Sequence, residues 1–205
     1  MVTKMANAVT HPAGGLAEAP MLGDHLAMDL LNTEARNDGK TVDYWSSGDD
    51  VLKWLARHGL VPSQGGSAPD PAGLLAQGKA LRDLARELIA QRKQDRIGDI
   101  ARLDAYLHAY LSAPHLARDA EGKLTLTRVV RADAIASALG PVAEAVAQLL
   151  ADGDFDLVKQ CQHPECILWF YDRTKAHKRR WCSMALCGNR YKAAQFRKKG
   201  NAASV

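Results

Sequence analysis

Apolar residues recur every three or four positions along much of the first 150 residues, which is the period of helices that pack on a core. In residues 22–36 the leucines fall at helical spacing, although this short run also fits a buried strand. A second helix is predicted after a cap at Ser47 or Asp49, and Gly59 ends it. Between the two segments, residues 37–47 are rich in turn formers and are interpreted as a loop.

Two longer helices are predicted next. Asp70-Pro71 opens the first, because proline suits the first turn of a helix, and the leucines that follow form one stripe. The second covers residues 97–113, with Pro114 predicted to end it. Its apolar stripe consists of Ile100, Leu103, Leu107 and Leu111.

A hairpin and a last helix complete this part of the chain. Residues 115–130 contain β-branched residues after a turn at Glu121-Gly122, which predicts two short strands. Residues 132–153 are predicted to form a helix that is interrupted or kinked at a central Gly-Pro pair. The pattern therefore predicts a mostly α fold, with an N-terminal helical domain that carries one small β-hairpin.

The closing third of the chain has a different pattern, in which apolar residues alternate with one another rather than with polar ones. Residues 167–171 would present Ile167, Trp169 and Tyr171 on one face and Leu168 and Phe170 on the other. We interpret 167–174 and 178–183 as the two arms of a β-hairpin, with one face free to pack on the helical domain. Residues 188–199 have helical propensity and predict a C-terminal helix.

Charge separates these two parts. The chain has 27 Lys and Arg against 23 Asp and Glu, yet residues 159–200 alone carry a net charge of +9. The remainder is net acidic, so we place a domain border near residues 152–158 and expect a basic partner-binding module after it. We predict the following parts: a flexible leader 1–20, a helical domain 21–155, a basic module 156–200 and a tail 201–205.

Composition narrows the setting. The chain is 47% hydrophobic and 24% charged, which is ordinary for a globular protein, and no apolar run approaches the length of a membrane span. The first 20 residues lack the apolar core of a secretory signal. We therefore expect a cytoplasmic protein without a membrane partner, in which cysteines serve metal binding or catalysis rather than disulfides.

All four cysteines lie in the basic module, as two pairs with four residues inside each pair and fifteen between them: Cys161, Cys166, Cys182 and Cys187. Two close thiolate pairs joined by a short hairpin suit one tetrahedral Zn²⁺. An iron–sulfur cluster and four free thiols are the alternatives. Four protein ligands leave no open position for water, so the predicted Zn²⁺ is structural, and His163 is a bystander.

The helical domain offers one polar cluster inside an apolar segment: Asp29, Asn32 and Thr33. These side chains would bind a small ligand, or they would cap and hydrogen-bond the N-terminal element. No nucleophile stands beside a base in the sequence, and no glycine-rich phosphate loop joins a strand to a helix. We therefore expect a protein that is not an enzyme.

The sequence RRWCSMALCGNR, residues 179–190, resembles the signature of the CGNR zinc finger, and CQHPECILWFYDRT resembles its first knuckle. Residues 23–33 and 51–61 resemble the ABATE domain that precedes this finger. The resemblance implies a bacterial, stress-induced transcriptional regulator with a treble-clef-like finger that binds DNA. It also implies that the helical domain senses an effector or forms a homodimer. His163 departs from the usual residue at its position.

On this resemblance the basic side chains of the finger would neutralise phosphates, and Asn189 and Arg190 would read base edges or, alternatively, hold the local structure. The expected nucleic-acid residues are Arg173, Lys175, Lys178, Arg179, Arg180, Asn189, Arg190, Lys192, Arg197, Lys198 and Lys199. Zinc fingers also bind RNA and proteins, so an RNA- or protein-interaction module is the alternative.

Overall fold

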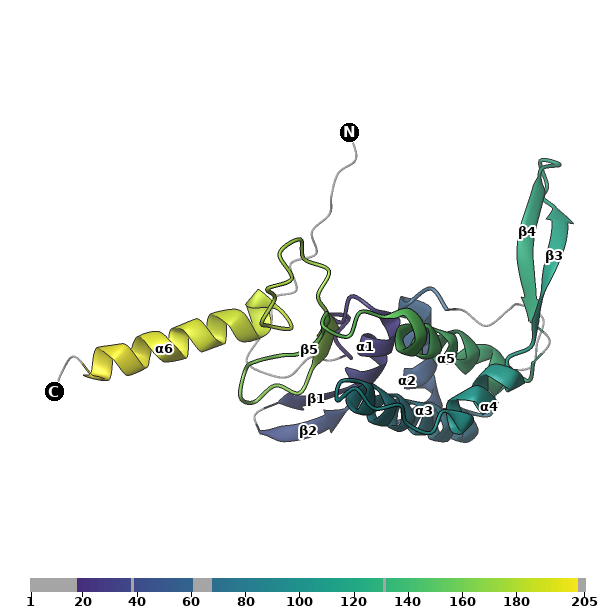
Figure 1. Cartoon of the computed structure of the whole chain (residues 1–205). Coiled ribbons are helices and arrows are strands. Elements are labelled where there is room, and N and C mark those ends of the chain that lie inside the picture. The colour runs from purple at the N-terminus through teal and green to yellow at the C-terminus, as the bar shows by residue number, and fades with distance from the viewer. Residues whose placement is uncertain (1–17, 38, 61–67, 131, 203–205) are drawn as a thin grey trace.

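The computed structural model describes residues 18–37, 39–60, 68–130 and 132–202, with the backbone alone for residues 37, 130 and 198–202 (Figure 1). Most of the predicted leader and tail therefore lies outside the described residues. The helices are α1 (Leu26–Leu31), α2 (Gly48–Arg57), α3 (Pro71–Arg92), α4 (Ala101–Ala109), α5 (Ala134–Asp152) and α6 (Asn189–Ala202). The strands are β1 (Glu34–Asn37), β2 (Lys40–Asp43), β3 (Ser112–Arg118), β4 (Leu124–Val130), β5 (Val158–Gln160) and β6 (Trp169–Tyr171), and they form three antiparallel two-stranded sheets.

The core of the helical domain lies around α1, which packs against α3 and α5. This segment is a helix, as the spacing of its leucines predicted, and not the buried strand that was the alternative. Met28, Leu30 and Leu31 are buried there, together with the apolar faces of the longer helices. The predicted start signals are confirmed: Ser47 and Asp50 form a capping box on α2, and Asp70 caps α3 with Pro71 in its first turn.

Of the interruption or kink predicted at its Gly-Pro pair, the interruption is wrong, because helix α5 runs through the pair as one element. Gly140 serves close packing instead, because a Cβ there would lie 2.1 Å from Cγ of Tyr110. By length and composition α5 would also be apolar enough to cross a membrane. In this structure it packs on α1, α3 and α4, and its apolar residues fill the domain core.

Two further predictions in this domain are corrected. Residues 37–47 are not simply a loop, because β1 and β2 form a hairpin there with Ala35 opposite Val42. Helix α4 ends at Ala109, and Pro114 lies inside strand β3 instead of stopping the helix. The hairpin β3–β4 itself is confirmed, with Gly122 in its turn at a φ of +82°.

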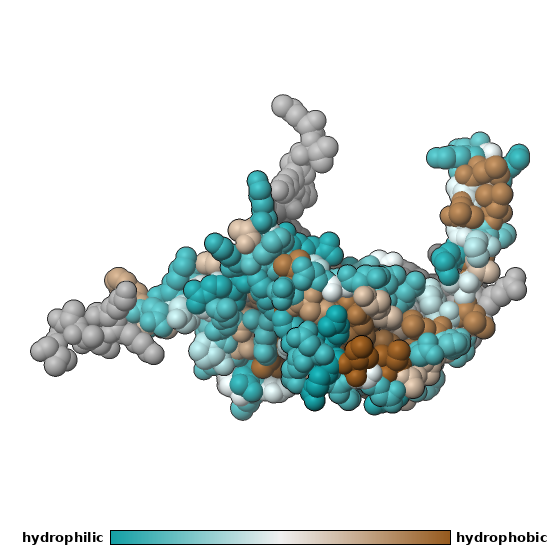
Figure 2. All heavy atoms as spheres, in the orientation of Figure 1, coloured by the Kyte–Doolittle hydropathy of each residue, from teal (hydrophilic) through white to brown (hydrophobic). Residues whose placement is uncertain are grey.

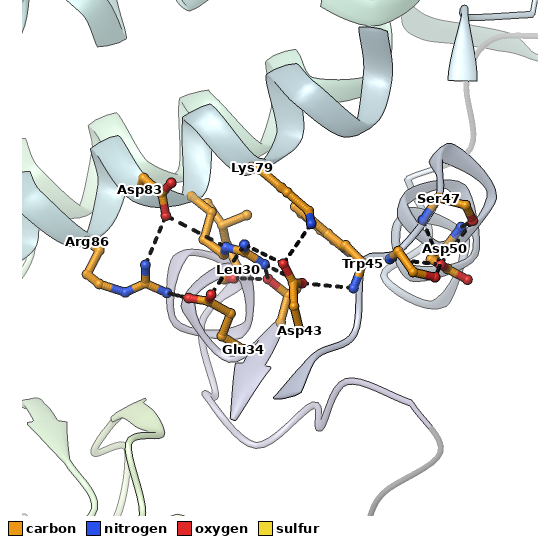
Figure 3. A network of polar contacts seen from close by, with 12 residues as sticks. Leu30, Glu34, Asp43, Trp45, Ser47, Asp50, Lys79, Asp83 and Arg86 are labelled. Atoms are coloured by element: carbon orange, nitrogen blue, oxygen red, sulfur yellow. Dashed lines mark hydrogen bonds and ion pairs between the residues drawn. The ribbon is translucent and has the colours of Figure 1, made fainter. Parts of the chain in front are cut away.

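A network of polar contacts joins the β1–β2 hairpin to α3, with Asp43 facing Lys79 and Glu34 facing Arg86 (Figure 3). The guanidinium of Arg82, with 3% of its side chain exposed, donates two 2.9 Å hydrogen bonds to the carboxylate of Asp43. Lys79 lies 2.9 Å from the same carboxylate, and Arg86 pairs with Glu34. Although burial raises the pKa of Asp43, the bonds from Arg82 and Lys79 outweigh it and lower that pKa to about 2.

In the closing third, β6 pairs with β5, in the register Lys159 opposite Phe170. The predicted pairing of 167–174 with 178–183 is therefore wrong. The reason is the buried carboxylate of Asp172, which accepts the backbone N–H of Arg179 at 2.9 Å and so holds this segment in a loop rather than a strand. Helix α6 follows the cysteines as predicted and projects from the rest of the molecule (Figure 1).

The two apolar faces predicted for β6 are confirmed. Leu168 and Phe170 are buried in a cluster with three of the cysteines. Trp169 and Tyr171 pack instead against the core of the helical domain. The strand thus joins the finger to the domain that precedes it, and the fold is a helical domain with small hairpins followed by a finger made of a hairpin and a C-terminal helix.

Candidate metal centre and basic surface

The four cysteines come together from two separate parts of the finger. Cys161 directly follows β5, and the turn after it brings back Cys166, whose N–H donates to the carbonyl of His163 at 2.9 Å. Cys187 lies inside the π-helical turn η1 (Met184–Gly188), while Cys182 lies just before it. The four Sγ atoms all lie within 4.8 Å of one another.

These distances fit a zinc ion. Zn–S bonds of about 2.3 Å in a tetrahedron place the sulfurs about 3.8 Å apart. The Cys166 and Cys182 sulfurs are 3.9 Å apart, and those of Cys182 and Cys187 are 3.5 Å apart. Cys161, Cys182 and Cys187 are buried, and the four thiolates complete the coordination of a structural Zn²⁺.

The electrostatics of the cluster also favour a cation. Hydrogen bonds from Cys166, Cys182 and Cys187 lower the pKa of the Cys161 thiol. The hydrogen bond to Cys161 instead raises the pKa of Cys182 and of Cys187, since a second thiolate would lie beside the first. Because four sulfurs at this spacing repel one another when ionised, a Zn²⁺ ion is what allows all four to be thiolates.

His163 takes no part in the cluster, as expected. Its Nδ1 accepts the N–H of Glu165 at 3.3 Å and so shapes the turn between the first two cysteines. On the other side, the hydroxyl of Ser183 accepts the N–H of Leu186 and starts the π-helical turn. A Cβ on Gly188 would lie 2.5 Å from Sδ of Met184, an exposed side chain that would have to move to make room for it.

Arg179 was predicted to contact nucleic acid, but the structure directs its side chain inward. Its Nε donates to the carbonyl of Trp181, and its NH2 donates to the carbonyls of Leu22 and Cys182. The guanidinium also pairs with Asp24 and lies 4.2 Å from the centre of the Phe170 ring. Only 17% of the side chain is exposed, so Arg179 joins the metal knuckle to the N-terminal domain instead of facing a partner.

The other expected cations fall into two groups. Arg173, Lys175, Lys178, Arg180, Arg190, Lys192 and Arg197 are exposed. The side chain of Lys198, like that of Lys199, lies outside the described residues. Arg180 donates to Oε1 of Gln162 and lies over Trp181, which in turn stacks on Tyr191 of α6.

The two residues expected to read base edges both lie at the start of α6. Asn189 is its first residue and is exposed. Arg190 is also exposed, and its NH2 lies 3.6 Å from Oε2 of Glu165, with more than half of each side chain in solvent. An ion pair this exposed contributes little to stability and leaves Arg190 free to exchange partners.

The polar cluster considered for a small ligand makes the hydrogen bonds that its structural alternative predicts. Asn32 donates from Nδ2 to the carbonyl of Trp169 and accepts its N–H, at 2.9 and 2.8 Å. Thr33 donates to the carbonyl of Leu30 and accepts from Arg82. Asp29 accepts the N–H of Gly23, and burial raises its pKa to about 6. All three side chains are buried and hydrogen-bonded to protein partners, which favours the structural alternative over a ligand site.

Two features of the structure escaped the sequence analysis. Asp172 is fully buried, and bonds from Lys159, Thr174 and Arg179 outweigh burial and hold its pKa well below the ordinary value. The sequence did contain a signal for Asp172, since it is one of only two acidic residues among eleven cations in residues 159–200. The second is an apolar groove of about 670 Å³ between the ends of α3, α4 and α5, lined by Leu88, Ile97, Ile100, Leu103, Leu107 and Leu150 among others.

Comparisons with known proteins agree with this architecture. Residues 24–153 match the ABATE family, described as "Putative stress-induced transcription regulator", and residues 158–200 match the CGNR zinc finger. No curated protein matches the chain. The chain therefore belongs to the ABATE family, and it carries a CGNR zinc finger after the ABATE domain.

Proposed function

We propose that this ABATE-family protein is a DNA-binding transcriptional regulator, in which the finger contacts the duplex. The observation that carries the proposal is the exposure of seven cations on a module that the structural Zn²⁺ and Arg179 hold rigid: Arg173, Lys175, Lys178, Arg180, Arg190, Lys192 and Arg197. Helix α6 contains no acidic residue and projects from the body, which leaves it accessible to a polyanion. The finger and the domain before it would act together in the cytoplasm as a binding protein, not an enzyme.

The start of α6 is the part that would read bases. Asn189 and Arg190 are exposed there, and their side chains match adenine and guanine edges in the major groove. Ala193 is exposed one turn further on, and its small side chain allows the helix backbone to come close to the bases. The cations on the loop 173–180 would then hold phosphates and fix the register of the finger.

Duplex DNA is to be tested against RNA and an acidic protein as competitors. The zinc-loaded chain should bind duplex DNA, and selection from random duplexes should enrich a motif. Equal competition by RNA or by the acidic protein would instead favour the alternative, an RNA- or protein-interaction module. Arg190→Ala should relax the motif, whereas Lys192→Ala should weaken binding to every duplex equally, since a phosphate contact carries no sequence information.

A second proposal concerns an effector. We propose that an apolar small molecule binds the groove between α3, α4 and α5, because Ile97 and Ile100 are 88% and 56% exposed beside it. Figure 2 shows apolar surface on the helical domain between the finger and the β3–β4 hairpin. Ile100→Trp would narrow the groove from an exposed position, so it should weaken the heat of ligand binding, while Met21→Trp, at an exposed position outside the groove, should leave it unchanged.

A further inference from the structure

The β3–β4 hairpin stands away from the rest of the molecule (Figure 1). Its two strands pair with each other over seven positions, from Ser112 opposite Val130 to Arg118 opposite Leu124. Within the part of the chain that the structure describes, no other helix or strand packs extensively on either strand. A two-stranded hairpin with nothing packed on it is only marginally stable in water, so this one needs a partner.

One face of the hairpin exposes three leucines to solvent, between Arg118 at one end and Arg128 at the other. Leu116 lies opposite Leu126, and Leu124, two positions before Leu126 on β4, lies on the same face. The exposed fractions of Leu116, Leu124 and Leu126 are 61%, 60% and 75%. Three neighbouring leucines exposed to solvent indicate an interaction surface.

The two edges of the hairpin differ. The N–H of Asp119 donates to the carbonyl of Lys123, which makes these two residues a hydrogen-bonded pair. Since such pairs alternate along antiparallel strands, the pair Pro114–Arg128 is not hydrogen-bonded across the hairpin, and its backbone groups face outward. Proline has no N–H, so Pro114 removes a donor from the outer edge of β3.

The outer edge of β4 has no such block. By the same alternation, the N–H and C=O groups of Leu124, Leu126 and Arg128 face outward along this edge. The strand LTLTRVV combines β-branched residues with leucines and contains no proline. It is therefore an open template for another strand.

We propose that a second copy of this chain occupies that edge, so that two β4 strands pair in antiparallel fashion about a twofold axis and form a four-stranded sheet. The alternation of Leu and Thr in β4 matches itself in this arrangement, apolar beside apolar, and the leucine faces of the two hairpins become continuous. Because Pro114 blocks the β3 edge, pairing stops at two chains and the assembly closes as a dimer. The dimer would also bring two basic fingers onto one partner, although the proposal does not depend on what the fingers bind.

A matched pair of substitutions in the full-length, zinc-loaded protein tests the pairing. Arg128→Pro removes an outward N–H at the β4 edge, whereas Arg128→Ala loses the same side chain and its bond to Ser112 but keeps the N–H. Sedimentation should give the mass of two chains for the wild type and for Arg128→Ala. In Arg128→Pro self-association should weaken by about tenfold or more, since two symmetric backbone bonds are lost. A monomeric wild type, or an Arg128→Pro protein that associates as tightly as Arg128→Ala, would overturn the proposal.

Amide exchange in the unmodified protein gives a second test, which does not depend on whether a variant folds. The outward amides of Leu124 and Arg128 should exchange slowly at high protein concentration and fast on dilution, while the outward amide of Leu116 on β3 stays fast at both. Slow exchange on the β3 edge, or fast exchange on both edges, would contradict pairing through β4. Either result leaves the proposed DNA contact of the finger intact, because that contact is measured by binding and not by mass.

Discussion

Asn32 forms two hydrogen bonds with the backbone of Trp169, one to its carbonyl at 2.9 Å and one from its N–H at 2.8 Å, although 137 residues separate them in sequence. The amide of Asn32 thus makes the pair of hydrogen bonds that a neighbouring strand would make to β6, and it joins the end of α1 to the finger. Arg179 makes the reverse connection, from the finger to Leu22 and Asp24. These contacts position the metal knuckle on the helical domain.

Replacing Asn32 should loosen this connection. Asn32→Ala leaves the N–H and the carbonyl of Trp169 without partners in a partly buried place, which costs about 1–3 kcal/mol of unfolding free energy. Urea denaturation measures the loss. Asn189→Ala is the matched control, because Asn189 is exposed, and its free energy of unfolding should stay within about 0.5 kcal/mol of the wild type. Equal stability of the two variants would contradict the role assigned to Asn32.

Removing the metal should unfold the finger and spare the helical domain. The finger buries only a small apolar cluster besides its cysteines, whereas the helical domain has its own core of helices α1 to α5. Chelation should therefore reduce the near-ultraviolet circular dichroism signal, to which Trp181 and Tyr191 of the finger contribute, while most far-ultraviolet helix signal remains. Cys182→Ser should act like the chelator, and Ala185→Ser, exposed in the same turn, should bind one zinc per chain as the wild type does. Unchanged spectra after complete zinc removal would be the contrary result.

The neighbouring arginines 179 and 180 should separate stability from binding. Arg179→Ala removes the contacts to Leu22, Trp181 and Cys182 and should destabilise the protein by about 2–3 kcal/mol, as loss of a buried charged hydrogen-bonding group does. Arg180→Ala should leave the denaturation midpoint in place and reduce the salt slope of DNA binding by about 0.9. The exchange of these two effects between the variants would refute the assignment.

Acid should weaken the network around Arg82. The folded-state pKa of Asp43 is about 2, below its ordinary value of 3.8, so the pair contributes stability above pH 4 and loses it as the pH falls from about 4 to 2. Because 27% of the Asp43 side chain is exposed, we expect about 1–2 kcal/mol rather than the full shift. Urea denaturation between pH 5 and 2 measures this, and Asp43→Asn should flatten that part of the profile. If Asp43→Asn lost stability in acid as the wild type does, a group other than Asp43 would be responsible for that loss.

The sequence predicted those parts of the structure whose signals are local. Helical spacing, the caps at Ser47 and Asp70, the turn at Gly122 and the cysteine spacing each depend on a few neighbouring residues, and the structure contains all of them. The apolar alternation in β6 was also sufficient, because it required a partner on each face. The resemblance to the two families, made on short motifs, is confirmed over most of the chain.

What the sequence could not predict depends on partners that are distant in the chain. Asn32 was considered for a ligand site because its partner is the backbone of Trp169, and a pattern of side chains does not identify a backbone partner. Arg179 and Arg180 look alike in the sequence, and only the folded chain places one against Phe170 and the other in solvent. The strand partner of β6 was mistaken because Asp172 takes backbone donors that a strand would have used.

The central claim is that the exposed cations of the zinc-held finger bind duplex DNA, and the dependence of that affinity on salt tests it most directly. Titration of the intact, zinc-loaded protein onto a duplex between 50 and 200 mM salt, about the range over which such contacts respond, should give a plot of log K against log salt that is linear. With six phosphate contacts its slope should be roughly −5, and chelation of the zinc should abolish the binding. No detectable binding to any duplex at low salt, or an affinity that does not change with salt, would contradict the account.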